Sequence, residues 1–263
     1  QNHFIRYLKV GGFPELALAE NDLFAQQILR EDVVDKVLKR DLPALYNIRN
    51  ATELERIFLY LCNVSSDIVS IEAITKELNG VSRTTVENYI SYLESANLIY
   101  QSWPVDMANK KVLKARPKIY IADAAIRNAV LMDDSFMTDT VEMGKIVETA
   151  VYKHIAAFYY QLATSVGYFR GGRKDKEIDV VVDYPNIRKI LIEVKYRDGA
   201  PIADDDAIVE LCDEASACIV VTKTADDFGI HNTPGGKNLL RIPAFAFLYL
   251  LGNAEKNGYR GIE

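Results

Sequence analysis

Apolar residues recur at three- and four-residue steps through the first half of the chain, and this spacing predicts helices. The longest example is residues 22–40, where one face of an amphipathic helix carries Phe24, Ile28, Leu29, Val33, Val37 and Leu38. Thr52 followed by Glu55 is typical of a capping box, in which each side chain binds the other residue's backbone N–H. A second helix is therefore expected to start there.

Two further helices and two short strands are predicted next. Residues 70–80 form a short helical pattern that ends at Gly80, and residues 81–99 form a longer one with Val86, Ile90 and Leu93 on one face. Two helices joined by a turn that contains glycine are typical of a helix-turn-helix. The β-rich runs IYQSWPV and PKIYIAD then bracket a basic loop. This order predicts a β-hairpin wing, and so a winged helix.

The second half of the chain predicts one helix followed by a sheet. The helix is expected within residues 141–162, and the strand candidates are VGYFRG, KEIDVVVDY, KILIEVKY and ACIVVTK. An acidic, helix-like stretch separates the last two strands, and LLRIPAFAFLYLL closes the pattern as a strand and then a helix. Strands with nearly continuous apolar cores favour a sheet covered on both faces. We therefore expect an α+β and α/β mixture, with a helical winged-helix domain followed by an α/β domain.

Composition and charge are those of an ordinary soluble globular protein. The chain has 263 residues, enough for two domains, and 31 basic against 37 acidic residues leave a net charge of −6. A binding site for nucleic acid would therefore have to be local. Three scattered cysteines without a CxxC spacing predict a reducing, cytoplasmic compartment. The pattern contains neither an apolar run long enough to span a membrane nor a secretory signal, so we expect no membrane partner.

The strongest chemical signal lies in two neighbouring strand candidates. Glu193 and Lys195 are two positions apart and so share one face of a strand. If the two strands pair as a hairpin, Asp179 lies at the same end of it. Two carboxylates suit Mg²⁺ or Mn²⁺, and a lysine beside them suits a phosphodiester substrate. The alternative is a surface salt-bridge cluster, because such residues alternate along strands by chance.

The order of these features resembles known families. One pattern resembles the PD-(D/E)XK nuclease-like fold of restriction endonucleases and Holliday-junction resolvases. It consists of Glu148 on a predicted helix, Asp179 on a predicted strand and then Glu193-Val194-Lys195 on the next strand. Over nearly the whole chain, the sequence is similar to the C-terminal portion of a large prokaryotic family of AAA+-type ATPases, in which a winged helix and a nuclease-like domain of unknown function follow the ATPase module. The similarity rests on the runs GGFPEL, PKIYIAD, GKIVE and IEVKYRDG, together with the helix-turn-helix.

The resemblance implies roles for four residues. Asp179 and Glu193 would bind Mg²⁺ or Mn²⁺, Glu148 would support them as a further ligand, and Lys195 would act in catalysis. The sequence departs from the broader nuclease pattern at Ile178, where proline usually precedes the aspartate. The resemblance also implies that residues 1–50 are an arm leading from an ATPase module, residues 51–130 the winged helix, and residues 140–252 the nuclease-like domain.

Candidate DNA contacts lie on the second helix of the helix-turn-helix and on the wing. They are Arg83, Thr84, Thr85, Asn88, Lys110, Lys111, Lys114 and Arg116, with Lys118 beside them. A second basic cluster near the strands comprises Arg170, Arg173, Lys174, Lys176, Arg188, Lys189 and Arg197. Winged helices also dock proteins, so DNA and a protein remain alternative partners.

Two functions are compatible with these features. The first is a DNA-binding module with a Mg²⁺-dependent, nuclease-like phosphodiesterase site. The second is a non-catalytic regulatory module that couples an upstream ATPase to DNA or to a protein partner. The sequence contains no GxxxxGK[ST] phosphate-binding loop, so we expect no ATP site in this chain and place any ATPase activity upstream of Gln1.

Overall fold

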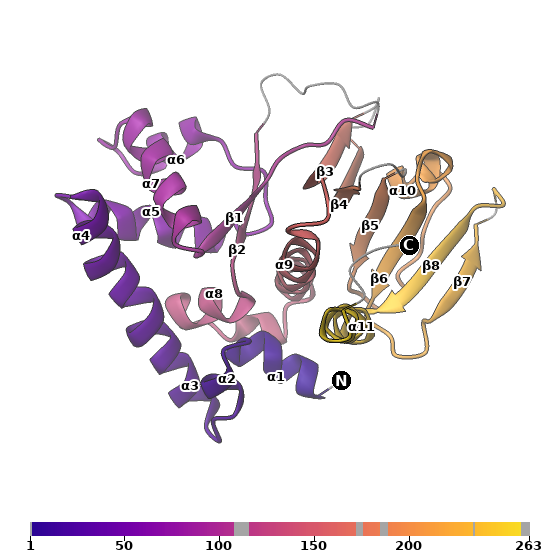
Figure 1. The fold of residues 1–263 in the computed structure, drawn as a ribbon, viewed down its shortest axis with the longest axis horizontal. Helices are drawn as coiled ribbons and strands as arrows, with labels where there is room; N and C mark the ends of the chain where they lie inside the picture. Colours follow the sequence, from indigo (N-terminus) through magenta and orange to yellow (C-terminus); the bar gives the residue numbers. More distant parts are fainter. Residues whose placement is uncertain (1, 108–115, 172–175, 185–188, 234, 259–263) are drawn as a thin grey trace. The chain divides into compact units, whose positions relative to one another are not determined.

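The computed structural model describes residues 2–107, 116–171, 176–184, 189–233 and 235–258. The chain divides into two compact units (Figure 1). The first unit comprises Gln1–Gln101 and Arg116–Ala150, and the second comprises Ser102–Ala115 and Val151–Glu263. The fold is therefore mixed, with a mainly helical N-terminal part and a C-terminal part built on a mixed sheet, as the apolar patterns predict. The finer division into an arm, a winged helix and a nuclease-like domain stays a prediction.

The described residues of the first unit are mostly helical. Its elements are α1 (Asn2–Val10), α2 (Pro14–Ala17), α3 (Asp22–Ile28), the π-helices η1 (Leu29–Asp35) and η2 (Val37–Asp41), α4 (Leu42–Tyr46), α5 (Ala51–Asn63), α6 (Ile71–Glu77), α7 (Arg83–Ser95), β2 (Lys118–Ile121), α8 (Ala124–Leu131), the 3₁₀ turn η3 (Ser135–Met137) and the first half of α9 (Thr140–Tyr159). Strand β1 (Ile99–Ser102) pairs with β2 in a sheet of two strands, as far as the structure describes them.

The predicted helix over residues 22–40 is present, but most of it is not an α-helix. It starts as α3 and continues in the wider turns of η1 and η2. Leu29, Val34 and Leu38 are buried, whereas Phe24, expected on the same apolar face, is 56% exposed. An α-helix has 3.6 residues per turn, so it would carry Val34 away from Leu29. In a π-helix, the backbone hydrogen bonds join residues i and i+5. Residues five positions apart therefore lie on nearly the same side of the helix.

The predicted helix-turn-helix elements are confirmed as the helices α6 and α7. Each begins at a serine that caps it, because Ser70 accepts a hydrogen bond from the Ala73 N–H at 3.0 Å and Ser82 accepts one from the Thr85 N–H at 3.1 Å. Gly80 lies in the turn between them with a φ of +94°.

The predicted capping box at Thr52 and Glu55 is wrong. Helix α5 already begins at Ala51, and its N-cap residue, Asn50, makes no side-chain capping hydrogen bond. Glu55 instead lies 3.6 Å from the Lys39 ammonium of η2. A contact with a neighbouring helix has replaced the local contact that the sequence suggested.

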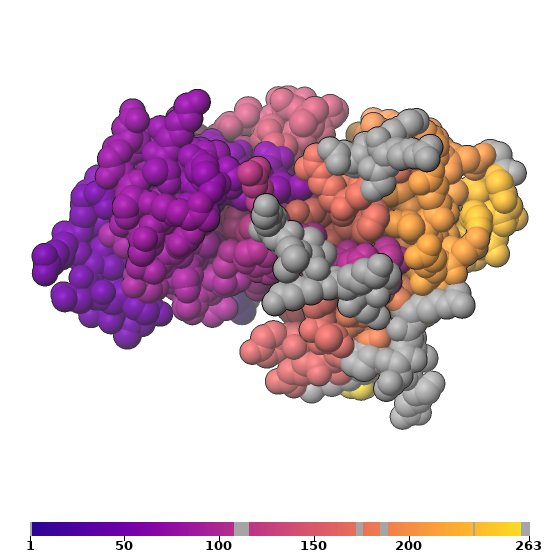
Figure 2. Space-filling model, turned by 90° about the horizontal axis from the view of Figure 1, so that it is seen from above, coloured from indigo at the N-terminus to yellow at the C-terminus, as the bar shows by residue number. Residues whose placement is uncertain are grey.

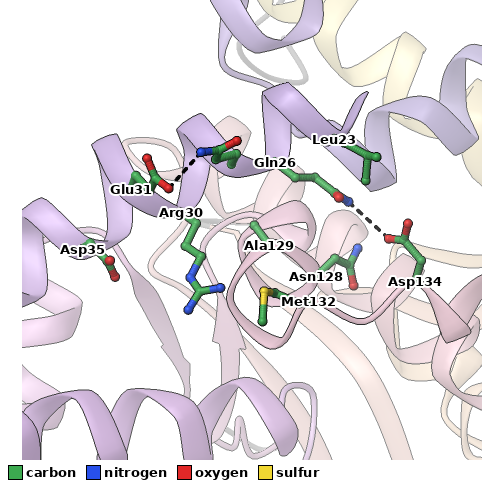
Figure 3. A pocket seen from close by; sticks show the side chains of 10 residues that line it. Leu23, Gln26, Arg30, Glu31, Asp35, Asn128, Ala129, Met132 and Asp134 are labelled. Carbon is green, nitrogen blue, oxygen red and sulfur yellow. Dashed lines mark hydrogen bonds between the residues drawn. The ribbon is translucent and has the colours of Figure 1, made fainter. Parts of the chain in front are cut away.

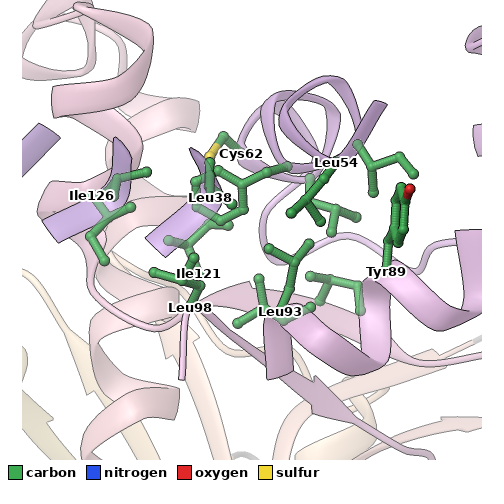
Figure 4. Packing of buried hydrophobic residues seen from close by; sticks show 14 of the residues in the cluster. Leu38, Leu54, Cys62, Tyr89, Leu93, Leu98, Ile121 and Ile126 are labelled. Carbon is green, nitrogen blue, oxygen red and sulfur yellow. The ribbon is translucent and has the colours of Figure 1, made fainter. Parts of the chain in front are cut away.

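One apolar cluster holds the helical unit together (Figure 4). It brings together Leu38 of η2, Leu54 of α5, Leu93 of α7 and Ile121 of β2, all at most 3% exposed. Packed against this cluster, the rings of Tyr46 and Tyr92 stack with a centroid separation of 3.8 Å and so join α4 to α7. In the space-filling view, the indigo and violet segments of this unit form a close-packed surface (Figure 2).

The run PKIYIAD, residues 117–123, ties distant segments to this core. The Ser66 N–H donates to the Ile119 carbonyl at 2.7 Å, and the Val69 N–H donates to the Pro117 carbonyl at 3.0 Å. Asp123, which is 4% exposed, caps α8 by accepting the Ala125 N–H at 3.0 Å, and its other oxygen accepts the Gly12 N–H at 3.1 Å. This buried carboxylate therefore joins the start of the chain to α8.

In the second unit, the predicted strands are confirmed. Its described elements are the end of α9, β3 (Ser165–Gly171), β4 (Lys176–Asp183), β5 (Ile190–Lys195), α10 (Ala207–Glu210), the 3₁₀ turn η4 (Cys212–Glu214), β6 (Ala217–Thr222), β7 (Gly229–Asn232), β8 (Asn238–Pro243) and α11 (Ala244–Lys256). The described strands form a sheet in the order β3-β4-β5-β6-β8-β7 (Figure 1). Neighbours from β3 to β5 are antiparallel, β5, β6 and β8 are parallel, and β7 is antiparallel to β8.

The sheet is covered on both faces at its centre. Val180, Val181 and Val182 of β4 are consecutive and fully buried, although successive side chains of a strand point to opposite faces. Helix α10 packs against β4 and β5, and α11 packs against β6 and β8. The acidic stretch before β6 yields only the short helix α10 and the turn η4, so less of it is helical than its pattern suggested.

Strand β7 has no counterpart among the predicted strands. The pattern of Gly229–Asn232 is not apolar, and Ile230 is 66% exposed. The strand is joined to the sheet through β8. Beside this pairing, Arg241 of β8 contacts the Asp227 carboxylate through Nε at 2.7 Å and through Nη2 at 2.6 Å. Arg241 thereby lowers the pKa of Asp227.

In the described part of the chain, no helix combines the length and the apolar character needed to cross a membrane.

Replacing Asp123 with alanine is expected to destabilise the fold by about 2–4 kcal/mol, because the helix loses its cap and the Gly12 N–H loses its acceptor. Urea unfolding followed by circular dichroism measures this difference. Asp198→Ala serves as the control. Asp198 is 81% exposed and pairs with Lys223 at the surface, so its loss is worth below about 1 kcal/mol. Equal effects of the two substitutions would contradict the role of Asp123.

Candidate functional site

The structure brings together three of the four residues predicted at the candidate metal site. Val180 of β4 pairs with Ile192 of β5, so the antiparallel register places Asp179 and Glu193 beside that pair at the same end of both strands. The Val194 N–H donates to Asp179 Oδ2 at 2.8 Å, which holds this carboxylate against β5. The hairpin pairing that the sequence analysis required is therefore present.

Glu193 and Lys195 form an ion pair on one face of β5. Glu193 Oε1 lies 2.8 Å from Lys195 Nζ, and their side chains are only 13% and 20% exposed. Burial by itself would lower the pKa of Lys195, but the negative charges of Glu193, Asp206 and Asp179 raise it above its usual value. Lys195 is therefore a protonated ammonium at neutral pH. It can offset negative charge, but it cannot accept a proton there.

Asp206 is a residue that the sequence reasoning left aside. It ends the run Asp204-Asp205-Asp206 in the acidic stretch before α10, and its charge acts on Lys195 from outside the strand that carries Lys195. Asp206 Oδ2 also accepts the Ala203 N–H at 3.1 Å, ahead of α10. Asp206 stands one residue before the short helix α10, which packs on β4 and β5. That position is the signal by which the sequence could have indicated Asp206 as a site residue.

Glu148 lies in the first unit, where two of its partners belong to β2. Its Oε1 accepts a hydrogen bond from the Tyr120 hydroxyl at 2.7 Å and lies 3.1 Å from Lys118 Nζ. The Lys118 side chain is 3% exposed and that of Glu148 15%. Lys118 is thus buried in an ion pair and does not belong to an exposed basic wing. The role of Glu148 as a further metal ligand stays a prediction.

Among the described residues, no group of three or more His, Cys, Asp and Glu side chains lies close enough to hold a metal ion. A divalent cation at the strand site would therefore depend on Asp179 and Glu193, with water completing its coordination. Mg²⁺ commonly uses one or two carboxylates in this way. The donor set, two carboxylates with hard oxygen atoms, fits Mg²⁺ or Mn²⁺.

The candidate DNA-contacting residues of α7 lie on its outer face, with one charge already neutralised. Arg83 Nε lies 2.8 Å from Glu87, and its Nη1 contacts Glu72 of α6. Thr84 and Asn88 are exposed, whereas the Thr85 hydroxyl is hydrogen-bonded to Ser82 at 2.8 Å. The outer face of α7 is therefore polar, and its one predicted basic residue, Arg83, is part of an ion-pair network.

The remaining basic candidates are divided between described and undescribed parts of the chain. Arg116 is exposed, and Lys110, Lys111 and Lys114 lie outside the described residues. In the second basic cluster, Lys176 contacts Glu210, and Lys189 is 5% exposed and lies 3.3 Å from Asp183. Arg173, Lys174 and Arg188 also lie outside the described residues. Several of the predicted cations therefore stabilise the fold.

Comparison with known proteins gives this chain a family. A model described as "Domain of unknown function (DUF8612)" matches residues 1–136, which is more than half of the chain. The chain belongs to the DUF8612 family. A second model, described as "Domain of unknown function (DUF4143)", matches residues 143–245. The DUF8612 match ends, and the DUF4143 match begins, close to the start of α9 at Thr140.

Relatives of this DUF8612 chain occur in archaea and bacteria. "Uncharacterized protein MJ1544" of Methanocaldococcus jannaschii is 27% identical over 194 residues, 72% of this chain and 41% of the relative. "Uncharacterized protein MJ1637" of the same organism is 23% identical over 193 residues, 72% of this chain and 39% of the relative. An "Uncharacterized protein" of Haemophilus influenzae is 25% identical over 128 residues, 47% of this chain and 32% of the relative. The matched part thus spans less than half the length of each relative.

Replacing Glu148 with glutamine is expected to destabilise the protein by about 1–3 kcal/mol, because the buried Lys118 ammonium loses its charged partner. The loss should be the same in Mg²⁺ and in EDTA if Glu148 serves the fold through Lys118. Urea unfolding in both buffers measures it. Glu72→Gln provides the control, since Glu72 pairs with Arg83 at an exposed site and its replacement should cost below about 1 kcal/mol. A loss seen only with Mg²⁺ would show instead that Glu148 binds the metal.

Proposed function

We propose that this chain is a DNA-processing module with a phosphodiesterase site, in which Asp179 and Glu193 bind Mg²⁺ or Mn²⁺ and Lys195 acts on the substrate. The observation that carries the proposal is the convergence of these three side chains on β4 and β5, where ionisable groups are costly to bury. A surface salt bridge would need neither this burial nor the second carboxylate.

The sheet supports a nuclease-like fold of the PD-(D/E)XK type. An antiparallel β3-β4-β5 meander continues into the parallel pair β5 and β6, and the acidic residues lie on the two middle strands of that run. A helix, the second half of α9, precedes the meander, and the Tyr152 hydroxyl of this half lies 3.4 Å from the Val166 carbonyl of β3. This is the order of elements that the resemblance implies.

A divalent cation at Asp179 and Glu193 would stabilise negative charge on a phosphodiester and lower the pKa of water bound to it. The protein's own groups have separate tasks. The Val194 N–H orients Asp179, and the Lys195 ammonium holds the Glu193 carboxylate on the face of β5 that both side chains share. Because its pKa is raised, Lys195 remains a cation that can hold a phosphate oxygen or the developing charge on it.

A winged helix made of α6, α7, β1 and β2 would hold the DNA. The two capped helices and the following pair of strands support this assignment. Arg83 is paired with two glutamates, so it would approach phosphate as part of an ion-pair network. The basic residues predicted on the wing, Lys110, Lys111, Lys114 and Arg116, would add to the attraction. The DUF4143 match supports the further proposal that this chain works with an upstream AAA+-type ATPase module.

The test is cleavage of labelled single-stranded, duplex and branched DNA by the full chain, with Mg²⁺, Mn²⁺ or EDTA. We expect cleavage that depends on the cation and falls about a hundredfold or more in Asp179→Asn and in Glu193→Gln. Asp198→Asn, an exposed acidic residue of the same unit, should cleave like the wild type. Circular dichroism must show that all variants are folded.

Lys195→Met separates the charge role of Lys195 from a purely structural one. Without the ammonium, Glu193 keeps a full negative charge at the site, so the affinity for Mn²⁺ should stay the same or rise. Cleavage should still fall about a hundredfold. Calorimetric titration with Mn²⁺ beside the cleavage assay measures both. A parallel loss of Mn²⁺ affinity would contradict the assignment.

Binding of DNA without cleavage, unaffected by EDTA, would favour the non-catalytic regulatory module. The ion pair of Glu193 with Lys195 supports this second candidate, because it neutralises one of the two carboxylates without a metal. In that case Asp179→Asn would leave DNA binding unchanged.

A further inference from the structure

A pocket of about 640 Å³ lies in the helical unit, and none of the residues discussed for catalysis or DNA contact lines it. It opens between the long helix formed by α3 and η1 and the segment from α8 to η3 (Figure 3). Its volume falls within the range of about 300–1,000 Å³ that is usual for small-molecule sites. The lining residues are Leu23, Gln26, Gln27, Arg30, Glu31, Asp35, Asn128, Ala129, Met132 and Asp134.

The acidic residues of the pocket are all engaged by donors of the protein. Glu31 accepts the Gln27 amide at 3.0 Å, and Asp35 accepts Lys39 Nζ at 3.0 Å. Asp134 accepts the Gln26 amide at 3.2 Å, and its second oxygen lies 3.3 Å from Lys9 Nζ. The lysines therefore balance the charges of Asp35 and Asp134 before any ligand arrives, whereas the donor to Glu31 is a neutral amide.

Arg30 differs from these residues. Within the described chain, its guanidinium makes no hydrogen bond or ion pair, although it is only partly exposed and extends into the pocket (Figure 3). A guanidinium offers five N–H donors in a planar fork that matches an oxyanion. A bound anion would provide the acceptor that the Arg30 guanidinium lacks among the described residues of this concave site.

Asn128 supplies a second, independent observation. This residue lines the pocket and is fully buried, and its Oδ1 has no hydrogen-bond partner among the described residues. Its amide nitrogen is oriented by the Leu8 carbonyl at 3.3 Å. A buried acceptor without a donor is costly, so a ligand N–H or O–H at this side of the pocket would be favoured.

The π-helix is what directs Arg30 into the pocket. Arg30 and Asp35 are five positions apart in η1 and both line the same cavity, while Leu29 and Val34 are five apart and both buried. An α-helix would turn these pairs to different sides. Interruptions of α-helices by π turns are frequent at functional sites.

We propose that this pocket binds a small organic molecule that carries one carboxylate, held by Arg30, and a hydrogen-bond donor directed at Asn128. Leu23, Ala129 and Met132 provide an apolar surface for the body of the molecule. The three carboxylates around Arg30 disfavour an anion with several charges, so a carboxylate is preferred to a phosphate dianion or to nucleic acid.

The experiment measures binding of 4-hydroxybenzoate to the full chain by ligand-observed NMR and calorimetry. The neutral 4-hydroxybenzamide and the dianionic phenyl phosphate are the comparison probes. We expect binding of 4-hydroxybenzoate that weakens with salt, and affinities for both other probes that are lower by about tenfold.

Two arginine variants and one control complete the design. Arg30→Gln should weaken 4-hydroxybenzoate binding about tenfold or more, and Arg30→Lys should restore part of it. Arg49→Gln is the matched control, because Arg49 is exposed and lies outside the pocket lining. Equal binding by Arg30→Gln and wild type, equal affinity for the neutral amide, or no binding at millimolar concentration would each overturn the proposal. Tighter binding of phenyl phosphate would overturn the preference for a carboxylate.

Discussion

The helical unit depends on buried polar contacts made by one short run, residues 117–123. Lys118 and Tyr120 bind the Glu148 carboxylate of α9, and Asp123 binds the backbone N–H of Gly12. Buried charges and N–H groups are costly without partners, so each of these contacts admits few alternative positions of the segments that it joins. The apolar cluster supplies the larger stabilisation, while these contacts specify which segments meet.

The same contacts involve two residues that the sequence pattern had marked for chemistry. Glu148 and Lys118 were separate candidates, one for a metal site and one for a basic wing, yet they are partners in a single buried ion pair. Asp179, Glu193 and Lys195 differ from them because their strands pair directly and place all three at one end of β4 and β5. The two functional proposals therefore rest on different units: the strand site on the second and the Arg30 pocket on the first.

Much of the fold follows from local patterns. Apolar spacing and the glycine at residue 80 identified α6 and α7, and apolar runs identified β3 to β6, since these signals act within a few residues of one another. Strand β7 was missed because its residues are exposed and it pairs only with β8. The π turns of η1 and η2 were missed because the apolar face was sought only at three- and four-residue steps, which pass over Val34.

By itself, the sequence determined the mixed fold and the order of the helices and strands that it predicted. It also determined the candidate pair Glu193 and Lys195, because alternation along one strand fixes which side chains share a face. Tertiary structure alone decided that Asp179 joins that pair, that Glu148 is bound by Lys118, and that Arg30 enters a pocket beside Asn128. The reason is physical: these contacts join residues far apart in the chain. Their energies depend on burial and on partners that no local pattern contains.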